Sequence, residues 1–200
     1  MIHELKEIIK QAVINQQKGL KNVLATVVFL EGSSYRKPGV RMLISEDLSS
    51  VGAVSGGCVE KEIIHRATTV FRDNKPKVIT YDGRYKLGCE GILYVLIEPF
   101  FVTAQFISAF SKANSKRESL QLTSYFKKEN EVFGEFGTSV TFENRQQFAF
   151  TETVITKSDV AVYNQVLQPA FKLIIIGGEH DAVKLCKIAA TLGWEVEIIT

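Results

Sequence analysis

Two glycines and a cysteine stand directly before an amphipathic run in GAVSGGCVEKEIIHRA, residues 52–67. After Cys58, apolar residues recur every three or four positions with charged residues between them, which predicts a helix from Cys58 to about residue 71. The first turn of a helix offers unpaired backbone N–H groups and the positive end of the helix dipole, so it favours bound anions and the thiolate form of a cysteine. Gly56 and Gly57 would let another group approach the backbone closely. The other interpretation is a small buried cysteine in an ordinary strand-to-helix turn.

A second polar segment, GSSYRKPGVR at residues 32–41, joins hydroxyls and cations within ten residues. Guanidinium groups bind phosphate through a planar fork of donors, and lysine binds it as a mobile point charge. The glycines and Pro38 predict a loop, and loops frequently carry binding sites. The candidate anion-binding side chains here are Ser33, Ser34, Arg36, Lys37 and Arg41. A solvated surface loop would have the same composition.

The chain has three widely spaced cysteines, Cys58, Cys89 and Cys186. Their odd number and spacing argue against a disulfide framework and agree with reduced thiols. Cys58 and Cys89 could also be zinc ligands or form a redox disulfide, but neither belongs to a short C-x-x-C pair. Cys186 is expected on the buried apolar side of its helix, in a packing role.

Composition restricts the class of protein. The 200 residues include 24 basic and 22 acidic side chains, so a net charge of +2 excludes a generally basic binder of nucleic acid or membrane surfaces. The N-terminal residues lack the apolar core of a signal peptide, and the apolar runs are shorter than the ~18 residues that a membrane span requires. We therefore expect a cytoplasmic globular protein.

The hydrophobic periodicity predicts a mixed α/β chain. Helices are expected from Ile2 to a stop at Gly19 and at residues 58–71, 101–113 and 181–192. Strands are expected at residues 23–32, 40–45, 50–55, 77–81 and 173–176, within residues 88–100, and after Gly193. Residues 120–167 alternate like a meander of short strands. Pro169 marks a boundary, so we expect an α+β domain of mixed sheet and helices at residues 1–168 and a truncated Rossmann-like βαβ unit at residues 169–200.

The glycine turn of the C-terminal unit raises the possibility of an NAD(P)-dependent oxidoreductase. Gly177 and Gly178 begin the turn, but Glu179 fills the place of the second glycine of the G-x-G-x-x-G fingerprint. The acidic residue expected after the second strand is also missing, so we do not expect NAD(P) to bind. A thiol-redox or sulfur-relay protein that uses Cys58 and Cys89 is the remaining alternative.

Four segments in this order resemble the XdhC/CoxI family, the accessory proteins of xanthine dehydrogenase and related molybdenum hydroxylases. They are EGSSYRKPGVRMLI, SVGAVSGGCVE, LGCEGILYVLIEP and IIIGGEHDAVKLCKIAATLGWEVEI. The resemblance implies an α+β domain followed by a Rossmann domain. It also implies a non-catalytic chaperone that binds molybdenum cofactor, supports its sulfuration and delivers it to an apo-hydroxylase. Many relatives look like Cys-Gly-Gly where this chain has Cys89-Glu90-Gly91, a departure that places an acid beside the expected anion site.

The chemistry of that cofactor, a pterin with a phosphate and a molybdenum dithiolene, matches these residues. The loop at 32–41 would supply cations, and Gly56, Gly57 and the following helix would supply backbone N–H groups. Cys58 and Cys89 would supply soft thiolates that contact molybdenum or persulfide sulfur. From the resemblance we expect the apo-hydroxylase as partner, a cysteine desulfurase as a further partner, and a homodimer.

Overall fold

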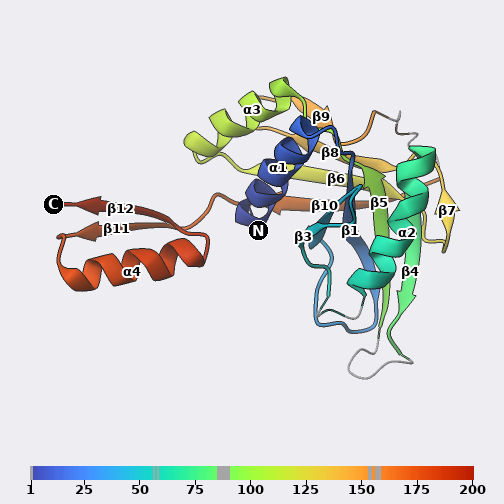
Figure 1. Ribbon diagram of the computed structural model, residues 1–200, viewed down its shortest axis with the longest axis horizontal. Coiled ribbons are helices and arrows are strands. Elements are labelled where there is room, and N and C mark those ends of the chain that lie inside the picture. The colour runs from blue at the N-terminus through green and yellow to red at the C-terminus, as the bar shows by residue number, and fades with distance from the viewer. Residues whose placement is uncertain (1, 56, 58, 85–90, 153–154, 156–158) are drawn as a thin grey trace.

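The computed structural model describes residues 2–55, 57, 59–84, 91–152, 155 and 159–200, and these form a mixed α/β structure (Figure 1). The helices are α1 (Ile2–Gln17), α2 (Glu60–Asp73), α3 (Ala104–Ser115) and α4 (His180–Thr191). The first strands are β1 (Asn22–Glu31), β2 (Arg41–Ser45), β3 (Ser50–Gly52), β4 (Lys77–Asp82), β5 (Ile92–Pro99) and β6 (Leu120–Phe126). The others are β7 (Val132–Phe133), β8 (Gly137–Thr141), β9 (Gln147–Ala149), β10 (Ala161–Leu167), β11 (Lys172–Ile176) and β12 (Glu195–Ile199).

Sheet A is antiparallel and has the strand order β3-β2-β1-β5-β4-β7. Its central strands, β1 and β5, are rich in β-branched and aliphatic residues, which fit a sheet covered on both faces. One face packs on α2 through Ile63, Ala67 and Val70, which are fully buried. The other face packs on α1 and on a second sheet. β1 therefore contributes to hydrophobic cores on both sides of sheet A.

Sheet B is antiparallel with the strand order β10-β6-β8-β9. The meander predicted over residues 120–167 is only partly correct, because two of its strands pair elsewhere. β7 leaves the sheet and pairs with the edge of β4 in sheet A. β10 returns to the free side of β6, so the last strand lies beside the first. Local alternation predicts a strand but does not specify its partner.

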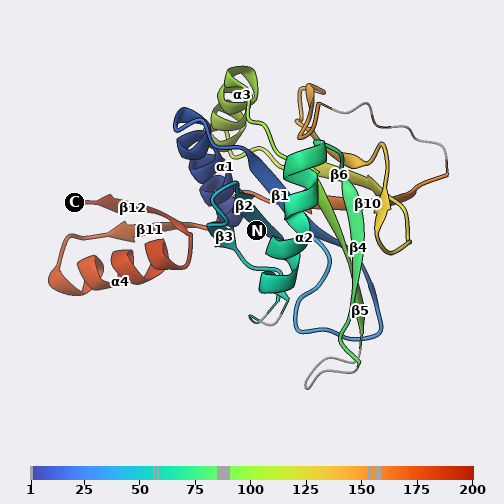
Figure 2. The same ribbon diagram turned by 45° about the vertical axis from the view of Figure 1, so that its right-hand side comes forward.

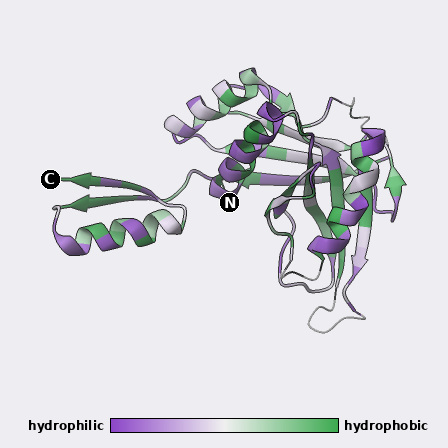
Figure 3. Ribbon diagram, in the orientation of Figure 1, coloured by the Kyte–Doolittle hydropathy of each residue, from purple (hydrophilic) through white to green (hydrophobic). Residues whose placement is uncertain are grey.

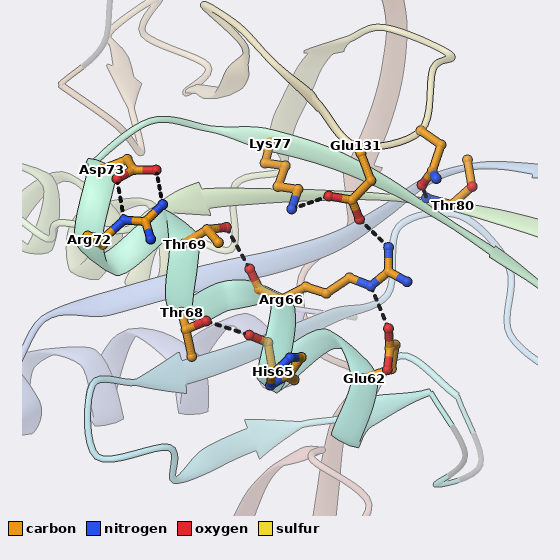
Figure 4. Close-up of polar contacts among 11 residues, drawn as sticks. Glu62, His65, Arg66, Thr68, Thr69, Arg72, Asp73, Lys77, Thr80 and Glu131 are labelled. Atoms are coloured by element: carbon orange, nitrogen blue, oxygen red, sulfur yellow. Dashed lines mark hydrogen bonds and ion pairs between the residues drawn. The ribbon is translucent and has the colours of Figure 1, made fainter.

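A cluster of charged side chains holds β7 against sheet A (Figure 4). Glu131 forms ion pairs with Arg66 of α2 and with Lys77 of β4, and Arg66 also bonds to Glu62 at 2.6 Å. Lys77 is only 4% exposed and lies over the ring of Phe133. A buried ammonium must have a partner, so Glu131 fixes the segment before β7 to two elements at once.

The C-terminal unit consists of β11, α4 and β12, with the two strands parallel, and it projects from the rest of the chain (Figures 1 and 2). β11 is apolar after Lys172, whereas β12 has Glu195 and Glu197 on either side of Val196 before its apolar end (Figure 3). Ile176 is 86% exposed. The structure thus shows one βαβ unit. Its assignment to a Rossmann-like domain, and the division at residue 168, stay predictions.

The prediction that Cys186 is buried is wrong, since this cysteine is only half-buried. Ala182 and Ala189 are the buried residues of α4, whereas Val183 and Leu185 are nearly half exposed. A two-stranded sheet is narrower than the apolar stripe of the helix, so much of that stripe stays in water. Across the described residues, no helix is long and apolar enough to cross a membrane.

The ion pairs of Glu131 make a prediction about stability. Glu131→Gln should lower the free energy of unfolding by about 2 kcal/mol, because it leaves the buried Lys77 ammonium without its carboxylate. Adding Lys77→Met should recover much of this loss, since no buried charge then remains. Urea unfolding measures both changes, with Glu129→Gln, at an exposed neighbouring position, as the control. Equal stability of Glu131→Gln and the parent chain would contradict the assignment.

Candidate functional site

The three segments singled out in the sequence leave sheet A at the same end. β1 ends at Glu31 and β4 ends at Asp82, and each of these residues lies opposite Ile92, the first residue of β5. On the other side, Gly52 at the end of β3 lies opposite Met42 near the start of β2. Antiparallel pairing therefore places the loop 32–40 beside the connection between β4 and β5. The segment 53–59 leaves towards the same end from β3, whose last residue lines up with Ala25 of β1, six residues before Glu31. Figures 1 and 2 show the loop 32–40 (blue) and the start of α2 at this end of the sheet.

Gly91 is in close contact with the backbone at the start of the loop 32–40. A Cβ at Gly91 would lie 2.5 Å from the carbonyl oxygen of Ser33 and 2.6 Å from that of Glu31, so a side chain at this position would displace backbone. Gly83 N–H donates to the Gly91 carbonyl at 2.9 Å, which closes the connection at its base. The connection between β4 and β5, which contains Cys89 in the sequence, therefore begins and ends beside the loop 32–40.

Gly39 anchors the far end of the same loop. Its φ is +100°, and a Cβ would lie 2.3 Å from Gln165 Nε2 and 2.7 Å from the Tyr163 hydroxyl. Gly39 N–H donates to the Val27 carbonyl at 2.8 Å. Only glycine satisfies both the left-handed backbone and the close approach of sheet B.

Arg41 lies under this loop rather than on it. The side chain is buried, and its Nη1 donates to the Gly39 carbonyl at 2.8 Å and to Gln165 Oε1 at 2.7 Å. Burial lowers the pKa of Arg41 to about 10, against the opposing influence of Tyr163, Glu98 and Glu4. The structure therefore makes Arg41 an internal support, whereas the sequence placed it among the cations open to a ligand.

Glu98 is the second charged group between the two sheets, and sequence reasoning missed it. Its carboxylate accepts hydrogen bonds from the Thr138 backbone N–H at 2.8 Å and from the Thr138 hydroxyl at 2.6 Å. Complete burial raises its pKa to about 7, although Thr138 and the charge of Arg41 act in the opposite direction. The signal was present in the sequence as a glutamate within the apolar run ILYVLIEP.

The middle of the loop is the part that faces solvent. Ser33 and Lys37 are exposed, and Ser34 and Arg36 are partly exposed. No ion pair joins Arg36 or Lys37 to another residue in the described ranges, although the charge of Arg36 helps to lower the pKa of Glu4. The Nε of Arg36 is enclosed and has no hydrogen-bond partner there. Such a donor favours an acceptor supplied from outside.

The segment before α2 is organised by Ser55 and Glu60. The Ser55 N–H and hydroxyl donate to the two carboxylate oxygens of Glu60 at 2.7 and 2.8 Å, and Gly57 N–H donates to the Ser55 hydroxyl at 3.2 Å. Burial opposes ionisation of Glu60, but these hydrogen bonds hold its pKa below the ordinary value. α2 begins at Glu60, two residues after the predicted start, and Val59 is its N-cap residue.

Three of the predicted site residues, Gly56, Cys58 and Cys89, lie outside the described residues. Five other predicted site residues lie towards one end of sheet A: Ser33, Ser34, Arg36, Lys37 and Gly57. Gly177 and Gly178 do not, because their turn lies at the outer end of the projecting C-terminal unit (Figure 1). In the described part of the chain, no three His, Cys, Asp or Glu side chains are grouped as metal ligands. The molybdenum or sulfur contact expected of Cys58 and Cys89 stays a prediction, and zinc binding or a disulfide stays an alternative to it.

Comparison with known proteins identifies relatives. Residues 16–82, which include the loop 32–40 and the segment 53–59, match the model of the XdhC and CoxI family, and this confirms the resemblance. A protein of Bacillus subtilis named as a probable xanthine dehydrogenase subunit is 28% identical over 192 residues, covering 87% of this chain and 58% of the relative. The crystal structure of a xanthine dehydrogenase from Bacillus halodurans matches with a TM-score of 0.70 at 22% identity, covering 96% of this chain and 61% of that chain, and shows the same fold. The chain spans about three fifths of the length of these two relatives.

The buried carboxyl of Glu98 predicts a pH dependence of stability. Its pKa is about 7 in the folded state against an ordinary 4.5, so the folded chain holds a proton that the unfolded chain has released between these values. Protonation of Glu98 therefore contributes roughly 3 kcal/mol to the free energy of unfolding. This contribution is fully present below about pH 4.5 and is lost as the pH rises to about 7. Urea unfolding across this range should show the loss in the parent chain and in the exposed control Glu7→Gln. Glu98→Gln should remove it, and an unchanged slope in that variant would contradict the assignment.

The turn at Gly177 predicts that NADH and NADPH do not bind to the C-terminal unit. Glu179 is the N-cap residue of α4 and Asp181 lies in its first turn, so two carboxylates stand where a pyrophosphate would approach. At about 4 Å a like-charge contact costs ~1 kcal/mol in water and ~4 kcal/mol at an effective dielectric of 20. Isothermal titration should detect no binding of either nucleotide. A saturable 1:1 isotherm at micromolar affinity would restore the oxidoreductase hypothesis.

Proposed function

We propose that this chain, which is similar to the XdhC and CoxI family over residues 16–82, binds molybdenum cofactor as cargo, supports its sulfuration, and delivers it to a hydroxylase of the xanthine dehydrogenase type. One observation carries the proposal: Gly91, at the end of the connection between β4 and β5, lies against the loop 32–40, and the segment 53–59 leaves sheet A towards the same end. The match of residues 16–82 to the family includes two of these three segments. The C-terminal unit is remote from this end and is not needed for the proposal.

The phosphate of the cofactor fits the cations of the loop. Arg36 and Lys37 are free of ion pairs with the described residues, and the enclosed Nε of Arg36 lacks an acceptor. The hydroxyls of Ser33 and Ser34 would add donors beside them. Because Gly39 and Gly91 fix the two ends of the loop, these groups need little reorganisation to bind an anion.

The start of α2 is compatible with a negatively charged ligand, although two carboxylates lie in its first turn. Both carboxylates already have partners, Glu60 in Ser55 and Glu62 in Arg66. The N-cap residue Val59 supplies no side-chain acceptor. Apart from the Glu60 N–H, which bonds to its own carboxylate, backbone N–H groups of the first turn remain for a ligand. Gly57 leaves the approach to this turn without a side chain.

The thiols complete the proposed site. Cys58 stands two residues before α2 and Cys89 two residues before Gly91, and both flanks lie at the same end of sheet A. Thiolates are soft ligands that suit molybdenum and can carry persulfide sulfur. We assign them to contact with the metal or its sulfur ligand, while the cations hold the phosphate. The chain's own role is then to bind and orient the cofactor rather than to catalyse a reaction on a metabolite.

The names of the relatives suggest the partner. One is called a probable component of xanthine dehydrogenase and the other a xanthine dehydrogenase, and a chaperone for the cofactor must meet the apo-enzyme that receives it. An apo-hydroxylase is therefore the proposed partner, with a cysteine desulfurase as the source of sulfur. A cytoplasmic homodimer is part of the same proposal.

Retention of the cofactor tests this function. The purified chain is mixed anaerobically with molybdopterin released from a molybdoenzyme, desalted, and assayed for bound molybdopterin. Arg36→Ala combined with Lys37→Ala should reduce affinity by about tenfold or more and weaken its salt dependence, because charge-assisted phosphate contacts contribute about 1.5–3 kcal/mol each.

The matched control is Lys184→Ala with Lys187→Ala, which removes the same charge from exposed positions on α4. This control should retain the cofactor like the parent chain. Equal loss in both double variants would show a nonspecific effect of net charge. Absence of retained molybdopterin in the parent chain would favour the thiol-redox or sulfur-relay alternative.

A further inference from the structure

Tyr35 is the most exposed aromatic residue in the described part of the chain, with 80% of its surface open to solvent. It lies in the loop 32–40, between the hydroxyls of Ser33 and Ser34 and the cations of Arg36 and Lys37. A tyrosine ring that is left in water gives up a large favourable burial energy. An exposed ring at this place therefore points to contact with something that the chain does not itself contain.

One face of the Tyr35 ring is already occupied by a cation. The Cζ atom of Arg36 lies 5.9 Å from the ring centroid, within the range of a cation–π contact. This contact biases the orientation of the ring, while the large exposed fraction leaves the opposite face available. A flat, electron-rich face of this kind accepts a planar heteroaromatic ring by stacking.

The loop that carries Tyr35 is fixed to the body of the protein on both sides. Gly91 packs against the Ser33 carbonyl, and the Gly39 carbonyl accepts a hydrogen bond from the buried Arg41. Only about five residues lie between these anchors, so the ring is presented on a short, tethered segment. A pre-positioned ring loses less conformational entropy on binding than a ring on a mobile tail.

We propose that Tyr35 is the stacking platform for the pterin ring of the cargo, with Arg36 held behind the ring and at the edge of the phosphate site. This inference rests on the proposed function and adds the group that would recognise the bicyclic part of the ligand. The cations recognise only charge, and charge alone does not distinguish this cofactor from other phosphates. Stacking on Tyr35 supplies selectivity for a planar heterocycle.

Substitutions of Tyr35 separate this role from that of the cations. Tyr35→Ala should weaken retention of molybdopterin by about tenfold, and Tyr35→Phe should restore it to within about twofold, because phenylalanine keeps the ring. Phe101→Ala, at an exposed aromatic position near the opposite end of sheet A, is the matched control and should bind like the parent chain. Circular dichroism confirms that all three variants fold.

A second probe, an oxidised 6-alkyl pterin without phosphate, makes the test specific. Its fluorescence should be quenched on binding to the parent chain and to Tyr35→Phe, and much less by Tyr35→Ala. The variant Arg36→Ala with Lys37→Ala should lose affinity for molybdopterin more than for this phosphate-free probe.

The outcomes distinguish the two proposals. If the parent chain retains no molybdopterin, the proposed function fails. If the parent chain and Tyr35→Ala retain it equally, only the stacking inference is overturned. If Tyr35→Ala binds normally but no longer transfers cofactor to an apo-hydroxylase, Tyr35 contacts the protein partner and the stacking inference is likewise wrong.

Discussion

The arrangement of the two main sheets depends on one buried guanidinium. Arg41 stands at the first position of β2, between sheet A and sheet B, and its Nη1 bonds to the Gly39 carbonyl and to Gln165 of β10. A buried cation whose partner is removed destabilises a protein by about 3–5 kcal/mol, so the groups around it are not independent. Glu4 of α1, and Glu98 of β5 in its ionised form, bring compensating charge. One side chain thus couples two sheets, a helix and the loop that carries the candidate site.

The same principle recurs at the other edge of sheet A. Lys77 is buried beside β7, and Glu131 supplies its charge partner while also pairing with Arg66. Both clusters join a segment of the second half of the chain to sheet A through a charge that cannot be left alone in the interior. The two clusters differ in whether cations remain for a ligand. Arg41 supports a loop whose cations Arg36 and Lys37 form no ion pair with the described residues, whereas Arg66 and Lys77 are both paired with Glu131.

Much of the fold follows from local periodicity, and the candidate site does not. The apolar stripe from Ile2 to Gln17 and the runs that became β1, β4, β5 and α3 were predicted near their true bounds, because each has a clear period of its own. Pairing of β1 with β5 joins residues that are 61 to 76 positions apart, from Glu31 with Ile92 to Val23 with Pro99, and no local pattern specifies it. The convergence of the loops is a consequence of that pairing. The sequence contained only a weak indication that Arg41 is buried. Arg41 begins a short apolar strand, β2, and lies on the same face of that strand as the buried Leu43.

The anchors and the ligand-facing residues of the loop 32–40 are different residues, and this separation decides how mutations there can be interpreted. Gly39, Arg41 and Gly91 pack against backbone or partly buried side chains of the two sheets, so changing them disturbs those sheets. Tyr35 and Lys37 are exposed and make no contact on which the cores depend. Truncating an exposed loop residue usually changes stability by less than about 0.5 kcal/mol. A loss of binding on substitution at these two positions therefore reports on recognition of the ligand, whereas the same loss at Gly39 or Arg41 would report on the fold.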